Sequence, residues 1–307
     1  VEFDARIVLL EPLGQGAYGV VYRAALVNPA SRDVAVKLLH RGGVGATNEQ
    51  LAEFRREIDM LRGLDHPRIV KVLGACVQPP RMSIVQEFVD GGSLHEVLHN
   101  SQYDTVHDGA NFGSEGSSFG SEGSHGRVTK SKISFRAQLT VAVDIADAVD
   151  YLHNVCDPKV IHRDLKPQNV LVDVRGRAKL ADFGMSKEGV DAADESFTMT
   201  LMPNGHGGWY APEVMRKKKP TQKVDVFMLG CCVCYIMTGG RHPFDAHDCR
   251  LFDVNSYERT ANVLAGKHDL HALLTLVSPQ HPAAFDLMRA MVDIEASERP
   301  TVAQALE

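Results

Sequence analysis

The sequence predicts an α+β protein built as two lobes, a small sheet-rich lobe followed by a larger, mostly helical one. Over about the first 90 residues, short apolar runs of β type alternate with turn residues and end in one amphipathic helix. Most of the remaining chain has helical periodicity. With 307 residues, 44% of them hydrophobic, the chain can bury a core of this size. We expect the first lobe to cover residues 1–89 and the second residues 90–307.

The net charge limits which kinds of partner the protein can bind. A formal net charge of -6 argues against a protein held on nucleic acid by phosphate contacts, because such proteins usually carry a basic face. We therefore expect protein substrates and small anions as partners. The longest uncharged apolar stretch, Val226 to Met237, is shorter than the roughly 20 residues that cross a bilayer, so it predicts a buried helix and no membrane segment.

The six cysteines are scattered, and three of them, Cys231, Cys232 and Cys234, fall inside this apolar helix. A zinc site needs spaced ligands around an accessible point, so buried free thiols are favoured over a metal site here, although the metal site stays the alternative. Free thiols fit a reducing compartment, which predicts an intracellular, cytoplasmic location.

A glycine-rich loop opens the candidate chemistry. Gly14, Gly16 and Gly19 form G-x-G-x-x-G-x-V between two strand-like runs, Ile7 to Leu10 and Val20 to Leu26. Glycines at this spacing let backbone amides approach a phosphate, but the motif also opens dinucleotide-binding helices and occurs in plain flexible hairpins. The strand-like run that follows disfavours the dinucleotide interpretation.

A lysine and a glutamate form the next candidate pair. Lys37 ends the apolar strand that begins at Val34, and Glu57 follows it by 20 residues. Glu57 lies at the edge of the apolar stripe of a helix that begins near a possible capping box, Thr47 to Gln50. The stripe consists of Leu51, Phe54, Ile58 and Leu61. A carboxylate there needs a cationic partner, and Lys37 is the candidate, unless it is a surface lysine at a strand end.

Residues 99–133 have a different composition, rich in Gly, Ser, Asp and Glu, with two nearly identical seven-residue units at Asn111 to Ser117 and Ser118 to Ser124. Such a segment buries too little apolar surface to offset the entropy of ordering it. We interpret it as a mobile insertion within the second lobe, with a binding tail as the alternative.

The most specific pattern runs from His162 to Asn169 and is followed by two short strands and then Asp182-Phe183-Gly184. With the glycine loop and Ala211-Pro212-Glu213, these motifs resemble the protein kinase superfamily over essentially the whole chain. The resemblance implies the two-lobe protein kinase fold, with a small antiparallel sheet and one main helix in the N-lobe and a larger, mostly helical C-lobe. It also implies the cofactors ATP and Mg²⁺.

The resemblance assigns the catalytic roles. Lys37 holds the α- and β-phosphates and is fixed by Glu57, while Asn169 and Asp182 bind magnesium. Asp164 accepts the proton of the substrate hydroxyl.

Lys166 faces the γ-phosphate by the same resemblance. A lysine two residues after the catalytic aspartate, Asp164, is the pattern of serine/threonine kinases, whereas tyrosine kinases usually place Arg and Ala around this position. Serine/threonine specificity is therefore favoured.

The resemblance also implies a nucleotide site. Its residues are Leu13, Gly14, Gln15, Gly16, Ala17, Tyr18, Gly19, Val20, Val21, Ala35, Lys37, Gln86, Glu87, Val89, Leu171 and Asp182. The adenine is expected between Val21 and Ala35 on one side and Leu171 on the other, with hydrogen bonds to the backbone near residues 87–89. Gln86 takes the gatekeeper position, where a polar residue of medium size is unusual.

The resemblance also implies an activation segment at residues 182–213. It pairs Glu213 with Arg299, and it makes Asp225 the anchor of the catalytic loop. Phosphorylation of this segment is expected to order it and to raise activity, because Arg163 can engage a phosphate. The candidate phosphorylation sites are Ser196, Thr198 and Thr200.

The finer resemblance differs along the chain. The tyrosine-kinase-like group is resembled by two segments, Gly91 to Leu94 and Cys156 to Pro158. The later part resembles the unfolded-protein-response sensor that joins a kinase to a ribonuclease, over Asp225 to Cys231, His242 to Phe244 and Arg259 to Leu264.

One position departs from the family pattern, because His206 stands where a threonine normally bridges the catalytic aspartate and lysine. This departure predicts a weaker kinase with a steeper loss of activity below neutral pH. The alternatives to an active enzyme are a nucleotide-binding pseudokinase or weakly active allosteric scaffold, and an interaction module whose useful part is the insertion.

Overall fold

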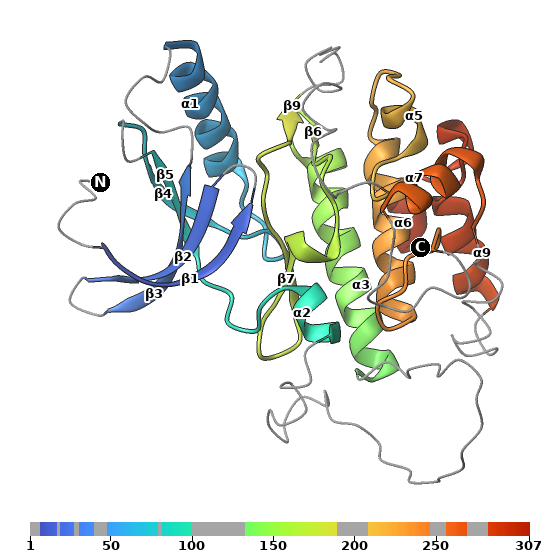
Figure 1. Cartoon of the computed structure of the whole chain (residues 1–307), viewed down its shortest axis with the longest axis horizontal. Coiled ribbons are helices and arrows are strands. Elements are labelled where there is room, and N and C mark those ends of the chain that lie inside the picture. The colour runs from blue at the N-terminus through green and yellow to red at the C-terminus, as the bar shows by residue number, and fades with distance from the viewer. Residues whose placement is uncertain are drawn as a thin grey trace, which may run out of the picture. The chain divides into compact units, whose positions relative to one another are not determined.

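A computed structural model of the chain describes residues 7–16, 19–27, 31–39, 48–78, 82–99, 133–188, 208–245, 256–268 and 282–307. By its internal contacts the chain divides into two units, Val1–Asp90 and Gly91–Glu307. The first unit contains an antiparallel sheet and a helix, and the second is mainly helical, as the ribbon in Figure 1 shows. This architecture confirms the predicted α+β fold class.

The first unit contains a five-stranded antiparallel sheet in the order β1-β2-β3-β5-β4. The strands are β1 (Ile7–Gly16), β2 (Gly19–Leu26), β3 (Arg32–Leu39), β4 (Val72–Cys76) and β5 (Ser83–Glu87). Alternate residues of the central strands form one buried cluster, namely Ala24, Val34, Val36 and Val85. The register of β1 against β2 shifts on either side of Pro12, a residue that has no N–H to donate to the ladder.

Helix α1 (Asn48–Gly63) packs against β4 in the same unit. It buries Phe54, Ile58 and Leu61 at the spacing of one helix face, while Leu51 is only partly buried. The predicted apolar stripe is thus confirmed for three of its four members. Thr47, the expected start of the capping box, lies outside the described residues.

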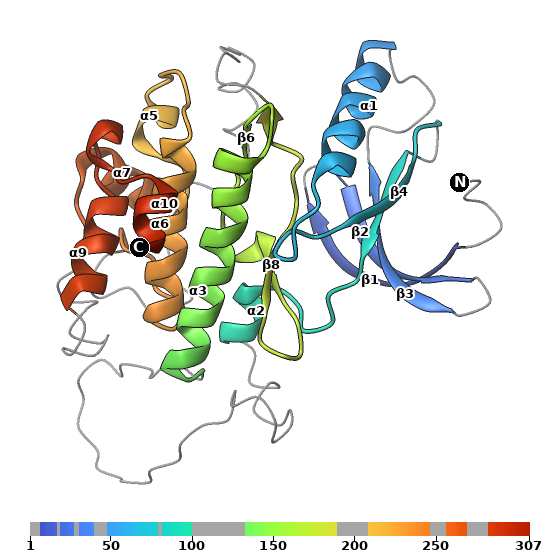
Figure 2. The same ribbon diagram turned by 180° about the vertical axis from the view of Figure 1, so that it is seen from behind.

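The second unit is organised around two long helices, α3 (Phe135–Asp150) and α6 (Lys223–Met237), which pack against each other. Figure 2 shows the short helix α10 (Val302–Leu306) beside α3, and α9 (Pro282–Met291) packs on α6. The other helices are α2 (Leu94–His99), the π-helix η3 (Tyr151–Val155), the 3-10 turns η4 (Pro167–Asn169) and η5 (Ala296–Glu298), α5 (Pro212–Met215) and α7 (Ser256–Ala265).

Two short antiparallel pairs complete the second unit. Strand β6 (Val160–Ile161) pairs with β9 (Lys187–Glu188), and β7 (Val170–Val172) pairs with β8 (Ala178–Leu180). The segment between β6 and β7 is the motif His162 to Asn169, so these pairs hold both ends of the catalytic loop.

Helix α6 is buried along nearly its whole length, as the apolar stretch predicts. Cys231, Cys232 and Cys234 are free, buried thiols in this helix, and burial raises their pKa values. In the part of the chain that the structure describes, none of the helices combines the length and the apolar character that crossing a membrane requires. Cys249 and nearly all of the predicted insertion, residues 100–132, lie outside the described residues.

Candidate active site

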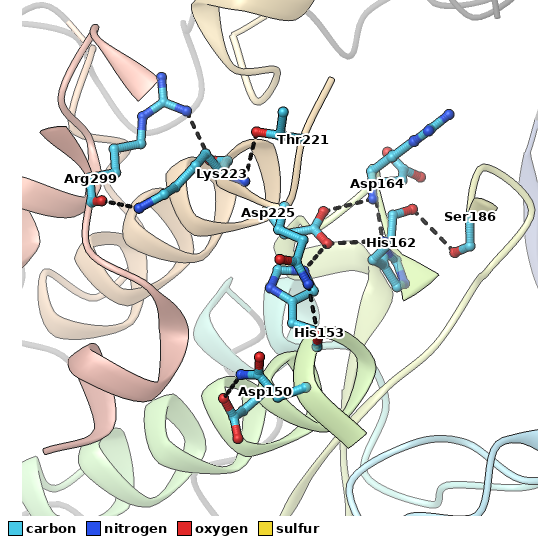
Figure 3. A network of polar contacts seen from close by, with 12 residues as sticks. Asp150, His153, His162, Asp164, Ser186, Thr221, Lys223, Asp225 and Arg299 are labelled. Carbon is cyan, nitrogen blue, oxygen red and sulfur yellow. Dashed lines mark hydrogen bonds and ion pairs between the residues drawn. The ribbon is translucent and has the colours of Figure 1, made fainter. Parts of the chain in front are cut away.

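Asp225, in the first turn of α6, fixes the backbone of the catalytic loop. Its carboxylate accepts the backbone N–H of His162 at Oδ2 and of Arg163 at Oδ1, each at 2.8 Å, and the Nε2–H of His153 at 2.8 Å (Figure 3). Arg163 takes a left-handed φ of 68°, which is uncommon for a residue with a side chain. The predicted anchoring of the loop by Asp225 is confirmed, and its two oxygens set the turn at Arg163.

The carboxylate of Asp225 is fully buried, and burial alone would raise its pKa. The hydrogen bond and the electrostatic attraction of His153, the electrostatic interaction with His162 and the N–H of Arg163 together outweigh burial and lower the pKa of Asp225. The attraction from His162 acts only to the extent that its ring is protonated. Its place in the first turn of α6 adds the favourable end of the helix dipole. The anchor is therefore an ionised carboxylate with its acceptor sites filled.

His162 joins the catalytic loop to the start of the activation segment. Its Nδ1 accepts the N–H of Asp164 at 3.3 Å, and its Nε2–H donates to the carbonyl of Ala181 at 3.2 Å. The ring also meets Phe183 edge to face at 4.7 Å between centroids. Complete burial lowers the pKa of His162, so the ring is neutral and its tautomer follows from these two hydrogen bonds.

Asp164 is oriented by two residues of its own loop. Lys166 Nζ donates to Oδ1 at 2.9 Å and to Oδ2 at 2.7 Å, and Asn169 Nδ2 donates to Oδ2 at 2.8 Å and to the Asp164 carbonyl at 2.7 Å. All three side chains are largely buried. The structure thus brings two of the predicted catalytic residues, Lys166 and Asn169, to the carboxylate of a third, Asp164.

Asp182 follows β8 and has a left-handed φ of 58°. A backbone of this kind in a residue other than glycine is strained and is typical of functional sites. The N–H of its neighbour Ala181 donates to the carbonyl of Asn169 at 2.9 Å, which holds the two predicted metal ligands on adjacent segments. Because the amide nitrogen of Asn169 serves Asp164, its amide oxygen is the atom suited to a cation. A carboxylate and an amide oxygen fit Mg²⁺, a hard ion that prefers oxygen ligands.

The end of the activation segment is held by a buried ion pair. Arg299 donates to Glu213 through Nη1 to Oε1 at 2.7 Å and through Nη2 to Oε2 at 2.8 Å. Its remaining N–H groups donate to the carbonyls of Asp293, Lys223 and Ile294. All five donors of the guanidinium are therefore used, and the pair implied by the family resemblance is confirmed.

In the first unit, the glycine loop is the turn between β1 and β2. Gly19 begins β2 so close to β3 that a Cβ at this position would lie 2.0 Å from the carbonyl oxygen of Leu38, whereas a Cβ at Gly14 would meet open space. Lys37 lies on β3 with Val21 and Ile84 as its strand partners, and it is largely buried. Of the two loop glycines whose surroundings the structure describes, packing thus requires Gly19 but not Gly14.

The remaining residues of the predicted nucleotide site are distributed over both units. Leu13 and Gln15 are exposed on β1, Val20 and Val21 are partly buried on β2, and Ala35 on β3 is the strand partner of Gln86 on β5. Glu87 ends β5, Val89 is buried, and Leu171 lies on β7.

Residues 7–307 match the family model described as protein tyrosine and serine/threonine kinase. The chain belongs to this family.

The kinase domain has close relatives among known proteins. It is 34% identical over 228 residues to the serine/threonine-protein kinase CTR1 of Arabidopsis thaliana, which covers 74% of this chain and 23% of the relative. It is 32% identical over 241 residues to the proline-rich receptor-like protein kinase PERK1 of the same plant, covering 78% of this chain and 31% of the relative. A putative serine/threonine-protein kinase/receptor, R831, of Acanthamoeba polyphaga mimivirus is 33% identical over 244 residues, covering 80% and 12%. The kinase domain thus spans less than a third of the length of these relatives.

Several predictions for the kinase domain fall on residues that the structure does not describe. Ala17, Tyr18, His206 and the side chain of Glu57 lie outside the described part. So do the candidate phosphorylation sites, Ser196, Thr198 and Thr200. The pair between Lys37 and Glu57 therefore stays a prediction.

Sequence reasoning missed two supports of the kinase loop. His153, in the π-helix η3, binds Asp225 through its ring and accepts the Gln222 side-chain amide at its carbonyl at 2.7 Å. Arg177 forms two bonds with Asp144 of α3, at 2.9 and 2.7 Å, next to the β7–β8 pair. Each pair joins residues that are far apart in the chain, so the sequence does not show that they meet. The one signal in the sequence was that a polar residue, His153 or Asp144, stands at a helix position that is expected to be buried.

Proposed function

We propose that this domain transfers the γ-phosphoryl group of ATP to serine and threonine side chains of protein substrates. The observation that carries the proposal is the arrangement of Lys166 and Asn169 around the Asp164 carboxylate, with donor distances of 2.7–2.9 Å. The lysine at this place in the loop favours serine and threonine over tyrosine as acceptors.

Asp164 acts as the proton acceptor in this proposal. A carboxylate held by two neighbours can receive the hydroxyl hydrogen of a bound serine or threonine with little reorganisation. Lys166, which carries a positive charge beside it, is placed to bind the γ-phosphate as the phosphoryl group leaves ATP. Asp164 and Lys166 thus orient the acceptor and the transferred group.

The nucleotide is held by the other predicted residues. Asn169 and Asp182 supply the oxygen ligands for Mg²⁺, which when bound neutralises charge on the β- and γ-phosphates. Lys37, fixed by Glu57, binds the α- and β-phosphates, and the glycine loop covers them with backbone amides. Val21, with the other predicted adenine-site residues, contacts the base.

Regulation and placement belong to the same proposal. Phosphorylation within residues 182–213 raises activity, as the nearby Arg163 suggests. The domain is placed in the tyrosine-kinase-like group, a proposal supported by the plant relatives. An intracellular, cytoplasmic location and the likeness of the later part to the kinase/ribonuclease sensor remain predictions.

The test is phosphate transfer from labelled ATP to a mixed peptide substrate, with and without Mg²⁺, followed by identification of the phosphorylated amino acid. Asp182→Asn and Lys37→Met are expected to abolish transfer. The matched controls are Asp286→Asn and Lys71→Met, which change exposed residues of surface ion pairs and should keep parental activity. Transfer by both folded site variants, or phosphotyrosine as the main product, would contradict the proposal.

A further inference from the structure

A run of exposed basic residues directly follows α5 and takes no part in the proposed catalysis. This basic turn consists of Arg216, Lys217, Lys218 and Lys219, which are exposed between the buried residues Val214 and Pro220. It is the only run of four consecutive basic residues in a sequence whose formal net charge is -6. A charge run is usually just solvated surface, but three structural features distinguish this one.

The first feature is a second helix end beside the basic turn. Arg216 Nη2 donates to the carbonyl of Leu264, in the last turn of α7, at 2.9 Å. Lys267 is exposed, follows α7 by two residues, and donates its N–H to the carbonyl of Asn262 at 2.9 Å. Figure 1 shows α5 and α7 as neighbours in the second unit. The ends of the two helices therefore bring the basic turn and Lys267 to one part of the surface.

The second feature is the backbone of Lys217, which has a left-handed φ of 57°. Its N–H donates to the carbonyl of Val214 at 3.0 Å, and the N–H of Lys218 donates to the carbonyl of Glu213 at 2.8 Å. These two hydrogen bonds are those of a Schellman turn, in which the left-handed position is usually glycine because a Cβ is unfavourable there. Glycine would form this turn with less strain, so the backbone does not explain why a lysine stands here.

The third feature is the lack of anionic partners within the described part of the chain. Arg216, Lys217 and Lys218 form no ion pair with a described Asp or Glu, and neither does Lys267. Arg23 on β2, in contrast, pairs with two carboxylates. Neighbouring cations without partners repel one another, and a bound anionic segment would relieve this repulsion.

We propose that the basic turn and Lys267 form a docking surface for an acidic segment of the protein substrate, separate from the residue that is phosphorylated. This inference rests on the proposed function, because it names the kind of substrate that the kinase domain selects. The basic turn directly follows the proposed activation segment, residues 182–213, and the ion pair of Glu213 with Arg299 holds their junction. A segment docked here is therefore bound to a fixed part of the domain.

The charge of the rest of the domain favours a short acidic segment over an extended polyanion. Nucleic acid or an anionic membrane would cover more than this surface and would meet the acidic remainder of a domain whose net charge is -6. A short segment rich in Asp or Glu contacts only the cations. Because these cations are exposed, each contact is weak and is screened by salt, so the affinity comes from several contacts together.

The first test measures binding without catalysis. A fluorescent, glutamate-rich peptide that lacks serine and threonine is titrated into the purified domain without nucleotide. The double variant Lys217→Gly/Lys218→Ala should bind it at least about threefold more weakly than the parent, whose own binding should weaken as salt is added. The matched control is Lys159→Ala/Arg175→Ala, which removes two exposed basic residues elsewhere in the second unit and should bind like the parent.

Equal affinity of the parent and of Lys217→Gly/Lys218→Ala for the peptide would overturn the proposal. Tighter binding of phosphatidylserine vesicles or of single-stranded DNA than of the peptide would also overturn it. Because glycine is favoured at a left-handed helix end, the double variant should melt no lower than the parent. Weaker binding that came only with a large fall in melting temperature would attribute the loss to folding and contradict the docking surface.

The second test connects this surface with phosphate transfer. Two peptides carry the same serine acceptor, and one continues into a glutamate-rich segment while the other continues into glutamine. For the parent, the acidic extension should lower KM and leave kcat unchanged, and Lys217→Gly/Lys218→Ala should lose this advantage. Transfer to neither peptide would contradict the proposed function, and the binding test would still decide the docking surface. Equal KM values for the two peptides with the parent would overturn the docking surface alone.

Discussion

Arg299 and Glu213 are joined by two parallel hydrogen bonds of 2.7 and 2.8 Å in a fully buried position, 86 residues apart in sequence. The planar guanidinium also stacks on Phe227, with its carbon 4.9 Å from the ring centroid. A lysine cannot reproduce either feature, because its ammonium is a single point charge. The stability of the second unit should therefore depend on this particular side chain.

The first prediction follows from this pair. Arg299→Lys is expected to lower the free energy of unfolding by about 1–3 kcal/mol, because a lysine keeps the charge but leaves buried acceptors of the guanidinium without a hydrogen-bond donor. Chemical denaturation of the purified domain measures this. The surface variant Arg289→Lys is the control, since its ion pair with Asp286 is exposed and 4.0 Å long. If both variants lost the same small amount of unfolding free energy, the buried pair would contribute no more to stability than the exposed one.

The second prediction concerns pH. Burial lowers the pKa values of His162 and His242, so the folded domain keeps both rings neutral while the unfolded chain protonates them near pH 6.5. A lowered folded pKa contributes stability that is fully present above the unfolded pKa. Below about pH 6.5 the free energy of unfolding should therefore fall, by up to about 1.4 kcal/mol per pH unit for each histidine.

His242→Gln tests this slope away from the catalytic loop. His242 is completely buried, its Nδ1 accepts the N–H of Phe244 at 3.3 Å, and its ring meets Trp209 at 4.5 Å. The variant should be less stable at pH 7.5 but should lose stability less steeply between pH 6.5 and 5. An unchanged slope would mean that His242 takes up no proton on unfolding.

The third prediction separates packing from function in the glycine loop. Gly19→Ala should displace the start of β2 from β3 and lower the melting temperature, because its Cβ would clash with the Leu38 carbonyl. Gly14→Ala should leave the melting temperature near that of the parent, because a Cβ there meets nothing within 4 Å. Thermal unfolding of both variants without nucleotide makes the comparison. Equal melting temperatures would contradict the close approach at Gly19.

The fourth prediction concerns the predicted insertion. Deleting Asp104 to Lys130 should leave the melting temperature and the basal activity nearly unchanged, because loop closure changes by only about 0.6 kcal/mol per doubling of loop length. Thermal unfolding and peptide phosphorylation of the shortened domain check it. A large fall in melting temperature would show that this segment packs on the domain.

The fifth prediction addresses the departure from the family pattern. His206→Thr should raise turnover and flatten the acid side of the pH–activity profile, because the family resemblance implies that this residue bridges Asp164 and Lys166, and a threonine carries no titrating charge. Steady-state rates between pH 6 and 7.5 measure both effects. If the variant matches the parent in rate and pH dependence, His206 has no part in catalysis.

The sequence was sufficient to predict features that depend on residues close together in the chain. His162 to Asn169 lie within one short loop, so their order already indicated that Asp164, Lys166 and Asn169 work together, and the structure brings their side chains within 2.7–2.9 Å. The apolar run of α6 likewise predicted its burial. Both are local signals, which a single sequence carries.

Sequence was insufficient where a site depends on distant contacts. The hydrogen bond from His153 to Asp225 joins residues 72 positions apart. His153 lies in the π-helical turn Tyr151–Val155, which the periodicity of the sequence did not predict. The hydrogen bonds between the rings of His95 and His99 and the hydroxyl of Tyr235 span 140 and 136 residues. Such meetings follow from how α2, α3 and α6 pack, and helical periodicity gives the buried face of a helix but not its partner.

The burial of α6 determines how heat should inactivate the domain. The loop that holds Asp164 takes its position from Asp225, and the segment that ends at Glu213 takes its position from Arg299, which binds the carbonyl of Lys223. Asp225 and Lys223 both lie in the first turn of α6, a helix that is buried along nearly its whole length. This helix cannot loosen without opening the core around it. Heat inactivation should therefore coincide with cooperative melting of the second unit, without an earlier stage in which a folded domain has lost its catalytic geometry.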